Sequence, residues 1–162
     1  MTTSTLLNIQ ENSITGTIPS EIGLLTDLTL SLGLHLNPIN GTIPTELGRL
    51  TLLQELLLFD SELSGPIPSE LGLLTSMGWL GLRNCLLSGE IPSQLSALNS
   101  SLYSLHMTGN PLLSGTLPKV LCSLNGTCFE GLLSVKPCLA EEYGLAFDCT
   151  EKLCGCGCDC LH

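Results

Sequence analysis

The stretch LQELLLFDSELSGPIPSELG, from Leu53 to Gly72, recurs with small changes along most of the chain. Five copies share one anchor glycine, and these glycines are Gly16, Gly41, Gly65, Gly89 and Gly115. Successive anchors are 25, 24, 24 and 26 residues apart. A fixed period of this length predicts a stacked solenoid, because no single repeat can bury its apolar edge without a neighbour.

Each copy begins with an alternation of inward and outward side chains. Leu56 and Leu58 alternate with Leu57 and Phe59, a period of two that is typical of a short strand with one buried face. The inward pairs in successive copies are Leu7/Ile9, Leu32/Leu34, Leu56/Leu58, Leu80/Leu82 and Leu105/Met107. Repeats placed side by side therefore predict a parallel sheet, with a free concave face on the outside of the strands.

A column of short side chains follows the strands. Its members are Asn12, Asn37, Ser61, Cys85 and Asn110. We expect these side chains to hydrogen-bond the backbone groups that are left bare where the chain turns out of each strand. Cys85 fits the column as a small buried thiol, which we favour over a reactive or paired cysteine because no basic residue adjoins it in the sequence.

The Gly-x-Ile-Pro segment after the column predicts a turn. Glycine gives the backbone extra freedom, whereas proline fixes φ and removes a hydrogen-bond donor. The return segments, such as residues 70–73, are too short for more than one turn of helix. We therefore expect short 3-10 or irregular segments on the convex side, opposite the sheet.

The Gly-x-Ile-Pro-x-x-Leu-Gly pattern resembles the plant-type leucine-rich repeat of receptor-kinase ectodomains and of secreted polygalacturonase-inhibitor-like proteins. The resemblance covers about residues 4–124, with single-residue insertions near 28–30, 99–101 and 110–114. It implies an α/β solenoid that coils right-handedly around a parallel concave sheet. It also implies a protein that binds other proteins or small ligands without catalysis. We assign residues 1–124 to the repeats and residues 125–162 to a cysteine-rich cap.

Composition argues against two classes of partner. The 162-residue chain has a formal net charge of −10, and its five Lys and Arg residues are scattered. Because nucleic acids and anionic membranes are bound by clustered basic side chains, we expect neither as a partner. No apolar run reaches the roughly 18 residues of a membrane helix. The first strand is expected almost directly after Met1, so we expect a fragment that lacks its leader, cap or membrane anchor.

The outward strand positions and the turns after them carry the candidate ligand-binding residues. These are His35, Leu57, Phe59, Asp60, Trp79, Arg83, Tyr103 and His106. They include all three aromatic residues of the repeats, and aromatic side chains are enriched in binding hot spots. The alternative is that scattered exposed aromatic residues are ordinary surface.

The repeat register predicts which of these residues are neighbours. His35, Phe59 and Arg83 occupy one position in consecutive repeats, so we expect Phe59 between a histidine and a cation. Asp60 is expected close to Arg83. In the adjacent position two glycines, at 33 and 81, flank Leu57, which predicts shallow space on both sides of it. The same register predicts that Glu55 lies beside Trp79.

The sequence argues against catalysis. His35 and His106 are three repeats apart, or roughly 14 Å at the usual strand spacing, which is too far to share a metal ion or a proton. The sequence contains no nucleophile elbow, phosphate-binding loop or paired-carboxylate motif. We therefore predict no enzymatic activity and no cofactor.

The last part of the chain is rich in cysteine. Its eight cysteines are Cys122, Cys128, Cys138, Cys149, Cys154, Cys156, Cys158 and Cys160. An even count in a short, loop-rich segment predicts a disulfide-linked cap, with a local Cys122–Cys128 bridge and one further strand at 145–149. The alternative is thiolate metal binding by the Cys-Gly-Cys-Gly-Cys-Asp-Cys run, which would suit zinc or copper(I).

Three N-glycosylation sequons begin at Asn40, Asn99 and Asn125, each in an expected turn or linker. Together with the cysteine-rich tail, they favour a secretory route. We therefore predict an extracellular or cell-surface recognition module that binds a protein, peptide or glycan on its concave face. The alternative is a structural or wall-associated repeat protein that acts as a spacer and has no discrete ligand.

Overall fold

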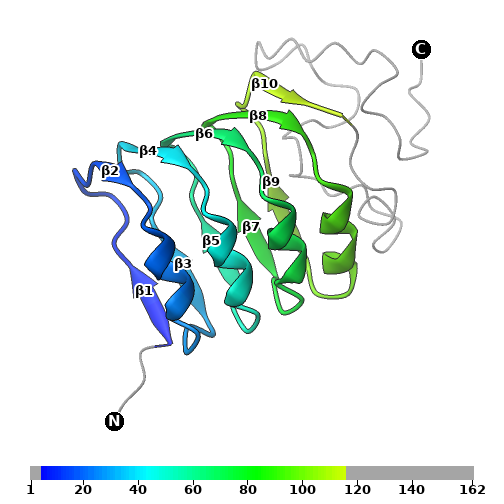
Figure 1. The fold of residues 1–162 in the computed structure, drawn as a ribbon. Helices are drawn as coiled ribbons and strands as arrows, with labels where there is room; N and C mark the ends of the chain where they lie inside the picture. The colour runs from blue at the N-terminus through cyan, green and yellow to red at the C-terminus, as the bar shows by residue number, and fades with distance from the viewer. Residues whose placement is uncertain (1–4, 116–162) are drawn as a thin grey trace.

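The computed structural model describes residues 5–115, which form two parallel sheets and a row of 3-10 helices (Figure 1). The first sheet contains, in order, β1 (Leu6–Asn8), β3 (Ser31–Gly33), β5 (Glu55–Leu57), β7 (Trp79–Gly81) and β9 (Ser104–His106). The second contains β2 (Gly16–Thr17), β4 (Ile39–Thr42), β6 (Glu62–Pro66), β8 (Leu86–Glu90) and β10 (Leu112–Ser114). The 3-10 helices are η1 (Ser20–Leu24), η2 (Thr45–Arg49), η3 (Ser69–Leu73) and η4 (Ser93–Ser100). Each coil of the solenoid thus visits three sides in turn.

The first sheet confirms the predicted leucine register. Leu32 pairs with Leu56, Leu56 with Leu80, and Leu80 with Leu105. These four side chains are at most 1% exposed. Burying one leucine contributes about 1.5–3 kcal/mol, and in this fold the apolar contact is made with the next repeat. The outward face of this sheet, called the first-sheet face below, is the face predicted to be concave.

The expectation of only short 3-10 or irregular segments on the other side of the coil was wrong for the Gly-x-Ile-Pro region. That region forms the second parallel sheet, which runs along the top of the molecule in Figure 1. Along β6 and the residue after it the side chains alternate, because Leu63 and Ile67 are buried whereas Glu62 and Pro66 are exposed. This period of two was present in the sequence, but the glycine and proline inside it masked the signal.

The 3-10 helices confirm the short return segments. Each begins directly after a proline, and three of the four are five residues long. The fourth, η4, has eight residues and contains part of the insertion predicted near 99–101. Neighbouring helices pack closely at the glycine of each Leu-Gly pair. A Cβ atom at Gly48 would lie 2.6 Å from the carbonyl oxygen of Glu70 in the next repeat.

The side chains of the polar column hydrogen-bond the backbone as predicted, and two asparagines, Asn37 and Asn110, make most of these bonds. The Asn37 side chain donates to the carbonyl groups of Ile9 and Leu34, at 3.0 Å each, and accepts from the Asn12 amide at 3.1 Å. In the last described repeat, the Asn110 side chain donates to the carbonyl groups of Leu82 and Met107 and accepts from the Leu87 amide. Both asparagines are at most 3% exposed. One side chain therefore connects two successive coils at the point where each leaves its strand.

The core of the described residues is aliphatic. It consists of leucine, isoleucine and methionine side chains together with Cys85, and it contains no aromatic residue between 5 and 115. This agrees with the prediction that the aromatic side chains of the repeats face outward. The predicted boundary at 124/125, the cystine-rich cap, the Cys122–Cys128 bridge and the strand at 145–149 lie outside the described residues.

Candidate functional site

Three consecutive strands of the first sheet lead into a stacked cluster just beyond their C-terminal ends. The ring of His35 stacks on Phe59 with 4.1 Å between the centroids, and the guanidinium carbon of Arg83 lies 4.9 Å from the Phe59 centroid. Phe59 therefore lies between a histidine and a cation, as the register predicted. Burial lowers the pKa of His35 below its ordinary value of 6.5, so the ring is neutral at pH 7.

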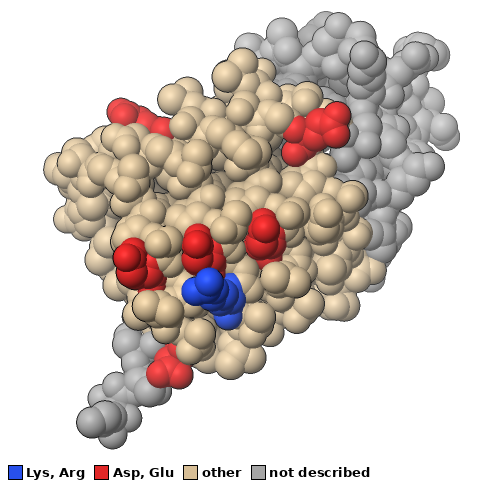
Figure 2. All heavy atoms as spheres, viewed as in Figure 1, with Lys and Arg blue, Asp and Glu red and all other residues tan. Residues whose placement is uncertain are grey.

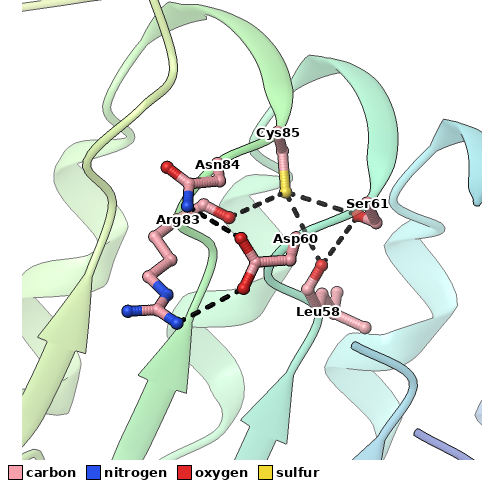
Figure 3. Close-up of polar contacts among 6 residues, drawn as sticks. All are labelled: Leu58, Asp60, Ser61, Arg83, Asn84 and Cys85. Carbon is pink, nitrogen blue, oxygen red and sulfur yellow. Dashed lines mark hydrogen bonds and ion pairs between the residues drawn. The ribbon is translucent and has the colours of Figure 1, made fainter. Parts of the chain in front are cut away.

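Asp60 holds this cluster in place from the turn that follows β5. One oxygen of its carboxylate accepts a 3.3 Å bond from Arg83, and the other accepts a 2.7 Å bond from the Asn84 amide (Figure 3). The predicted proximity of Asp60 to Arg83 is thereby confirmed. Asn84 was not predicted to take part. Because the Asp60 carboxylate pairs with the Arg83 guanidinium, the positive charge of Arg83 is already neutralised within the protein.

The residue before the polar column has a left-handed backbone in every described repeat. The non-glycine members are Glu11, Leu36, Asp60 and Asn84, with φ between 51° and 57°, and the fifth is Gly109. A left-handed conformation is uncommon for such residues and costs conformational energy. Here it turns the side chains of Asp60 and Asn84 toward each other. The sequence signal was the fixed place of these residues directly before the column.

A shallow groove of about 420 Å³ lies beside these turns, between the ends of the two sheets. Its lining includes the exposed side chains of Leu36, Pro38 and Glu62 together with Asp60 and Asn84. The groove adjoins the Phe59 cluster through Asp60. Of its lining residues, only Asp60 was among the predicted binding residues.

Cys85 is a buried free thiol, as predicted. Its sulfur lies 3.4 Å from the Ser61 hydroxyl and 3.3 Å from the carbonyl oxygen of Arg83 (Figure 3). Burial raises the pKa of the Cys85 thiol above its ordinary value, so the thiolate is disfavoured at pH 7. The arrangement suits a structural side chain of the polar column.

A second group of predicted residues is centred on Trp79, the first residue of β7. Trp79 is paired in register with Glu55 on one side and with Ser104 on the other, which confirms the predicted Glu55–Trp79 neighbours. The Trp79 and His106 rings are 6.1 Å apart. Tyr103, which is 64% exposed, has its ring directly against Gly78. The predicted site residues therefore form two groups, one around Phe59 beyond the C-terminal ends of the strands and one around Trp79, whose ring faces His106 at the end of β9.

The expected open space beside Leu57 is absent. A Cβ atom at Gly33 would lie 2.7 Å from the Asn8 side chain, and one at Gly81 would lie 3.0 Å from the Phe59 ring. Both glycine positions are thus covered by neighbouring side chains. Leu57 and His35 are only 7% and 6% exposed, so they support the face rather than protrude from it. Sequence register placed these residues correctly but could not show how far Phe59 and Asn8 lean over the glycines.

Two of the three sequons lie in the described part of the chain. Asn40 is exposed in the middle of β4, so its expected position in a turn was wrong. Asn99 is half-buried within η4. Asn125 lies outside the described residues. An asparagine in a strand can still present its amide to solvent when it points away from the core, as Asn40 does.

The row of 3-10 helices has an acidic surface. Glu21, Glu46 and Glu70 each lie in the first turn of successive helices, and Arg49 lies in the last turn of η2. Figure 2 shows acidic side chains in a row across this side, with a single basic group beside them. In residues 5–115 no helix has the length and apolar character needed to cross a membrane. The same residues contain no group of three or more metal-ligating side chains.

Comparison with known proteins places the chain among repeat proteins. The family described as "Leucine Rich Repeat" matches residues 5–25 and 101–124. A chain from the crystal structure of the Arabidopsis thaliana BIR3–SERK2 complex is 37% identical, with a TM-score of 0.67, over 76% of this chain and 64% of that chain. The ectodomain of the Arabidopsis thaliana receptor kinase GASSHO1/SCHENGEN3, solved with CASPARIAN STRIP INTEGRITY FACTOR 2, is 40% identical, with a TM-score of 0.65.

That second match covers 70% of this chain and 13% of the receptor. A plant ice-binding protein is 36% identical, with a TM-score of 0.68, over 75% of this chain and 39% of that protein. The chain therefore spans less than two thirds of the length of each of these proteins. No curated protein matches the sequence significantly.

Proposed function

The chain is a leucine-rich-repeat protein that resembles the ectodomains of plant receptor kinases, and on this premise we propose that it is a non-catalytic recognition module for a protein or peptide. The ligand binds on the first-sheet face. One observation carries the proposal: Phe59 and Trp79 lie on that face and Tyr103 is exposed directly before β9, whereas the core of the described residues has no aromatic side chain.

The energetics of binding favour this face over the acidic helical side. Aromatic side chains provide large contact area at low entropic cost, and such residues dominate binding hot spots. Phe59 is also preorganised by its contacts with His35 and Arg83, so little side-chain entropy is lost when a ligand covers it. A spacer protein without a discrete ligand would gain nothing from this arrangement.

The relatives support a protein or peptide as the ligand. One similar structure is a complex of two proteins, BIR3 and SERK2, and another is a receptor ectodomain solved with CASPARIAN STRIP INTEGRITY FACTOR 2. These partners belong to those proteins, and the present chain is proposed to share only the mode of recognition. A glycan remains the alternative ligand class for the same face.

We also propose that the protein is extracellular or cell-surface. The ectodomain character of its relatives and the sequons at Asn40, Asn99 and Asn125 support this location. The cysteine-rich segment after residue 121 is then proposed to form a disulfide-linked cap over the last repeat, as in an oxidising compartment. Of the two sequon asparagines in the described residues, Asn40 is the more accessible, and it is the proposed glycosylation site.

The proposal predicts that the protein selects ligands from a displayed library of random peptides. The wild-type chain should enrich binders, and the Trp79→Ala/Phe59→Ala double variant should bind them about 100-fold more weakly or worse, since each hot-spot residue typically contributes a factor of ten or more. Binding is measured by calorimetry with a synthetic copy of an enriched peptide. A glycan array tests the alternative ligand class.

The control variant is Leu73→Ala, which removes a 58% exposed side chain from η3 and should bind normally. Thermal unfolding checks that each variant folds. Trp79→Ala alone serves if the double variant does not fold, because Trp79 lies outside the core. Wild-type binding that survives in a folded Trp79→Ala variant would contradict the proposed face, and the absence of any enrichment would favour the spacer.

The second sheet supports a second candidate function. Each described strand of that sheet after β2 carries one short polar side chain directly before its anchor glycine, and these are Asn40, Ser64, Ser88 and Ser114. Two of the hydroxyl groups bond the preceding repeat, Ser64 to Gly41 at 3.3 Å and Ser114 to Gly89 at 3.2 Å. Polar groups on a sheet can order water, and one similar protein is a plant ice-binding protein.

Ice binding predicts that the purified protein shapes ice crystals and that Ser64→Tyr, in the central strand of the second sheet, abolishes the effect. The strand register weakens this candidate, because Asn40 is paired with Glu62 and Ser64 with Leu86, so charged and apolar side chains interrupt the polar ones. Observation of unshaped crystals under a cold-stage microscope would exclude the candidate. Trp79→Ala is the matched control, since it alters the other sheet and should leave ice shaping unchanged.

A further inference from the structure

We propose that Glu55, Trp79 and Tyr103 form a subsite for a cationic side chain, an arginine or a lysine, of the bound peptide. The subsite rests on the proposed function, because it specifies which chemical group the first-sheet face selects. It combines a carboxylate that has no partner among the described residues with two aromatic rings. The only described arginine on the same face is already held elsewhere.

The three residues lie at the start of neighbouring strands, since Glu55 and Trp79 are the first residues of β5 and β7 and Tyr103 directly precedes β9. Glu55 and Trp79 are register partners in adjacent parallel strands, so their side chains emerge on the same side at about the 4.8 Å spacing of a sheet. The backbone amide of Tyr103 donates to the Gly78 carbonyl at 2.9 Å. The Tyr103 ring covers Gly78, the residue before Trp79, so closely that a Cβ atom there would overlap the ring.

Glu55 is half-buried, and its carboxylate lacks a partner within the described part of the chain. Its carboxylate forms no hydrogen bond and no ion pair with any residue between 5 and 115, where the single ion pair joins Arg83 to Asp60. A partly desolvated carboxylate gains most from a charged donor, since charge-assisted hydrogen bonds are the stronger ones.

Arg83 is not available to neutralise Glu55. Its guanidinium lies over Phe59, at 4.9 Å from the ring centroid, and binds Asp60 at 3.3 Å. The other described basic residue, Arg49, lies on η2 in the helical row. A cation at Glu55 must therefore come from outside the described residues, and a bound ligand is the source we propose.

The surrounding charge favours a cation over an anion. Residues 5–115 contain nine Asp and Glu side chains and two Arg side chains, a formal charge of 2 − 9 = −7. The Trp79 ring, on the strand next to Glu55, adds the attraction that a ring face exerts on a cation. A neutral apolar group would cover Glu55 without pairing it, which is unfavourable. Arginine and lysine are therefore the side chains that fit.

The test uses a seven-residue, acetylated and amidated Gly/Ser peptide with one central arginine. Its twin carries citrulline, which has nearly the same shape but no charge. Trp79 is the only tryptophan in the chain, so its fluorescence reports directly on the subsite. We expect a saturable change with the arginine peptide at an affinity about fivefold or more above that of the citrulline twin. Glu55→Gln should remove the difference.

Glu62→Gln is the matched control, because it changes the net charge equally but lies in β6 of the second sheet. This variant should keep the preference for arginine. Equal binding of the two peptides to the wild-type protein would overturn the subsite. The same loss of preference in Glu62→Gln and Glu55→Gln would also overturn it, because bulk charge would then explain the result.

The peptide library separates this subsite from the proposed function. Peptides enriched by the wild-type chain should be rich in arginine and lysine, and those enriched by Glu55→Gln should lose this bias. Wild-type binders without basic residues would overturn the subsite while the recognition function stands. No enrichment at all, combined with a clear preference for arginine over citrulline, would support the subsite and contradict a peptide-recognition module.

Discussion

Replacement of Gly48 by alanine is expected to lower the free energy of unfolding by about 2–3 kcal/mol, although it adds only one methyl group. The new Cβ atom would lie 2.6 Å from the carbonyl oxygen and 2.8 Å from the Cβ atom of Glu70. These atoms belong to η3 in the next coil, so relief requires the two coils to move apart. Neighbouring leucines such as Leu47 and Leu71, at most 1% exposed, would then lose contact.

Gly33→Ala is the matched control for this effect. Its Cβ atom would also have a close neighbour, at 2.7 Å, but that atom is the end of the exposed Asn8 side chain. A flexible surface side chain can rotate away, whereas a backbone carbonyl within a stacked coil cannot. Urea unfolding followed by circular dichroism measures both variants. A Gly33→Ala cost equal to that of Gly48→Ala would contradict the argument that backbone contact sets the distance between coils.

The sequence predicted the first sheet well because its signal is local and repeated. Leu56 and Leu58 identify the inward face of one strand, and the 24-residue spacing of the repeats indicates which strands are neighbours. The second sheet was missed because its strands contain Gly65 and Pro66, residues that locally favour a turn. Pairing with the adjacent coil overrides that local preference, and pairing is visible only when coils are stacked.

The sequence predicted which residues of the candidate site are neighbours, but it did not predict how far each side chain is exposed. Register alone placed His35, Phe59 and Arg83 in one row, and the ring contacts agree. Register could not show that Phe59 would lean over Gly81 or that the Tyr103 ring would cover Gly78. The direction of a side chain depends on which neighbours leave space for it. A glycine leaves such space, but the sequence does not show which side chain fills it.

Asn37→Ala is expected to destabilise the protein by about 3–5 kcal/mol, because several buried backbone groups lose their partner at once. Its side-chain amide donates to the carbonyl groups of Ile9 and Leu34, and its side-chain oxygen accepts from the amides of Asn12 and Ile14. An alanine satisfies none of these groups. Urea unfolding gives the change in free energy.

Ser61→Ala, at the equivalent position of the next coil, should cost only about 1 kcal/mol. Its hydroxyl makes one short bond, of 2.8 Å, to the Leu58 carbonyl. Hydrogen exchange adds a spatial test, since a repeat solenoid responds to a local defect mainly in the coils that share it. Asn37→Ala should accelerate exchange in β1 and β3 while β7 and β9 keep their protection. Uniform acceleration across all coils, or equal costs for the two variants, would show that the asparagine is not the connection between coils.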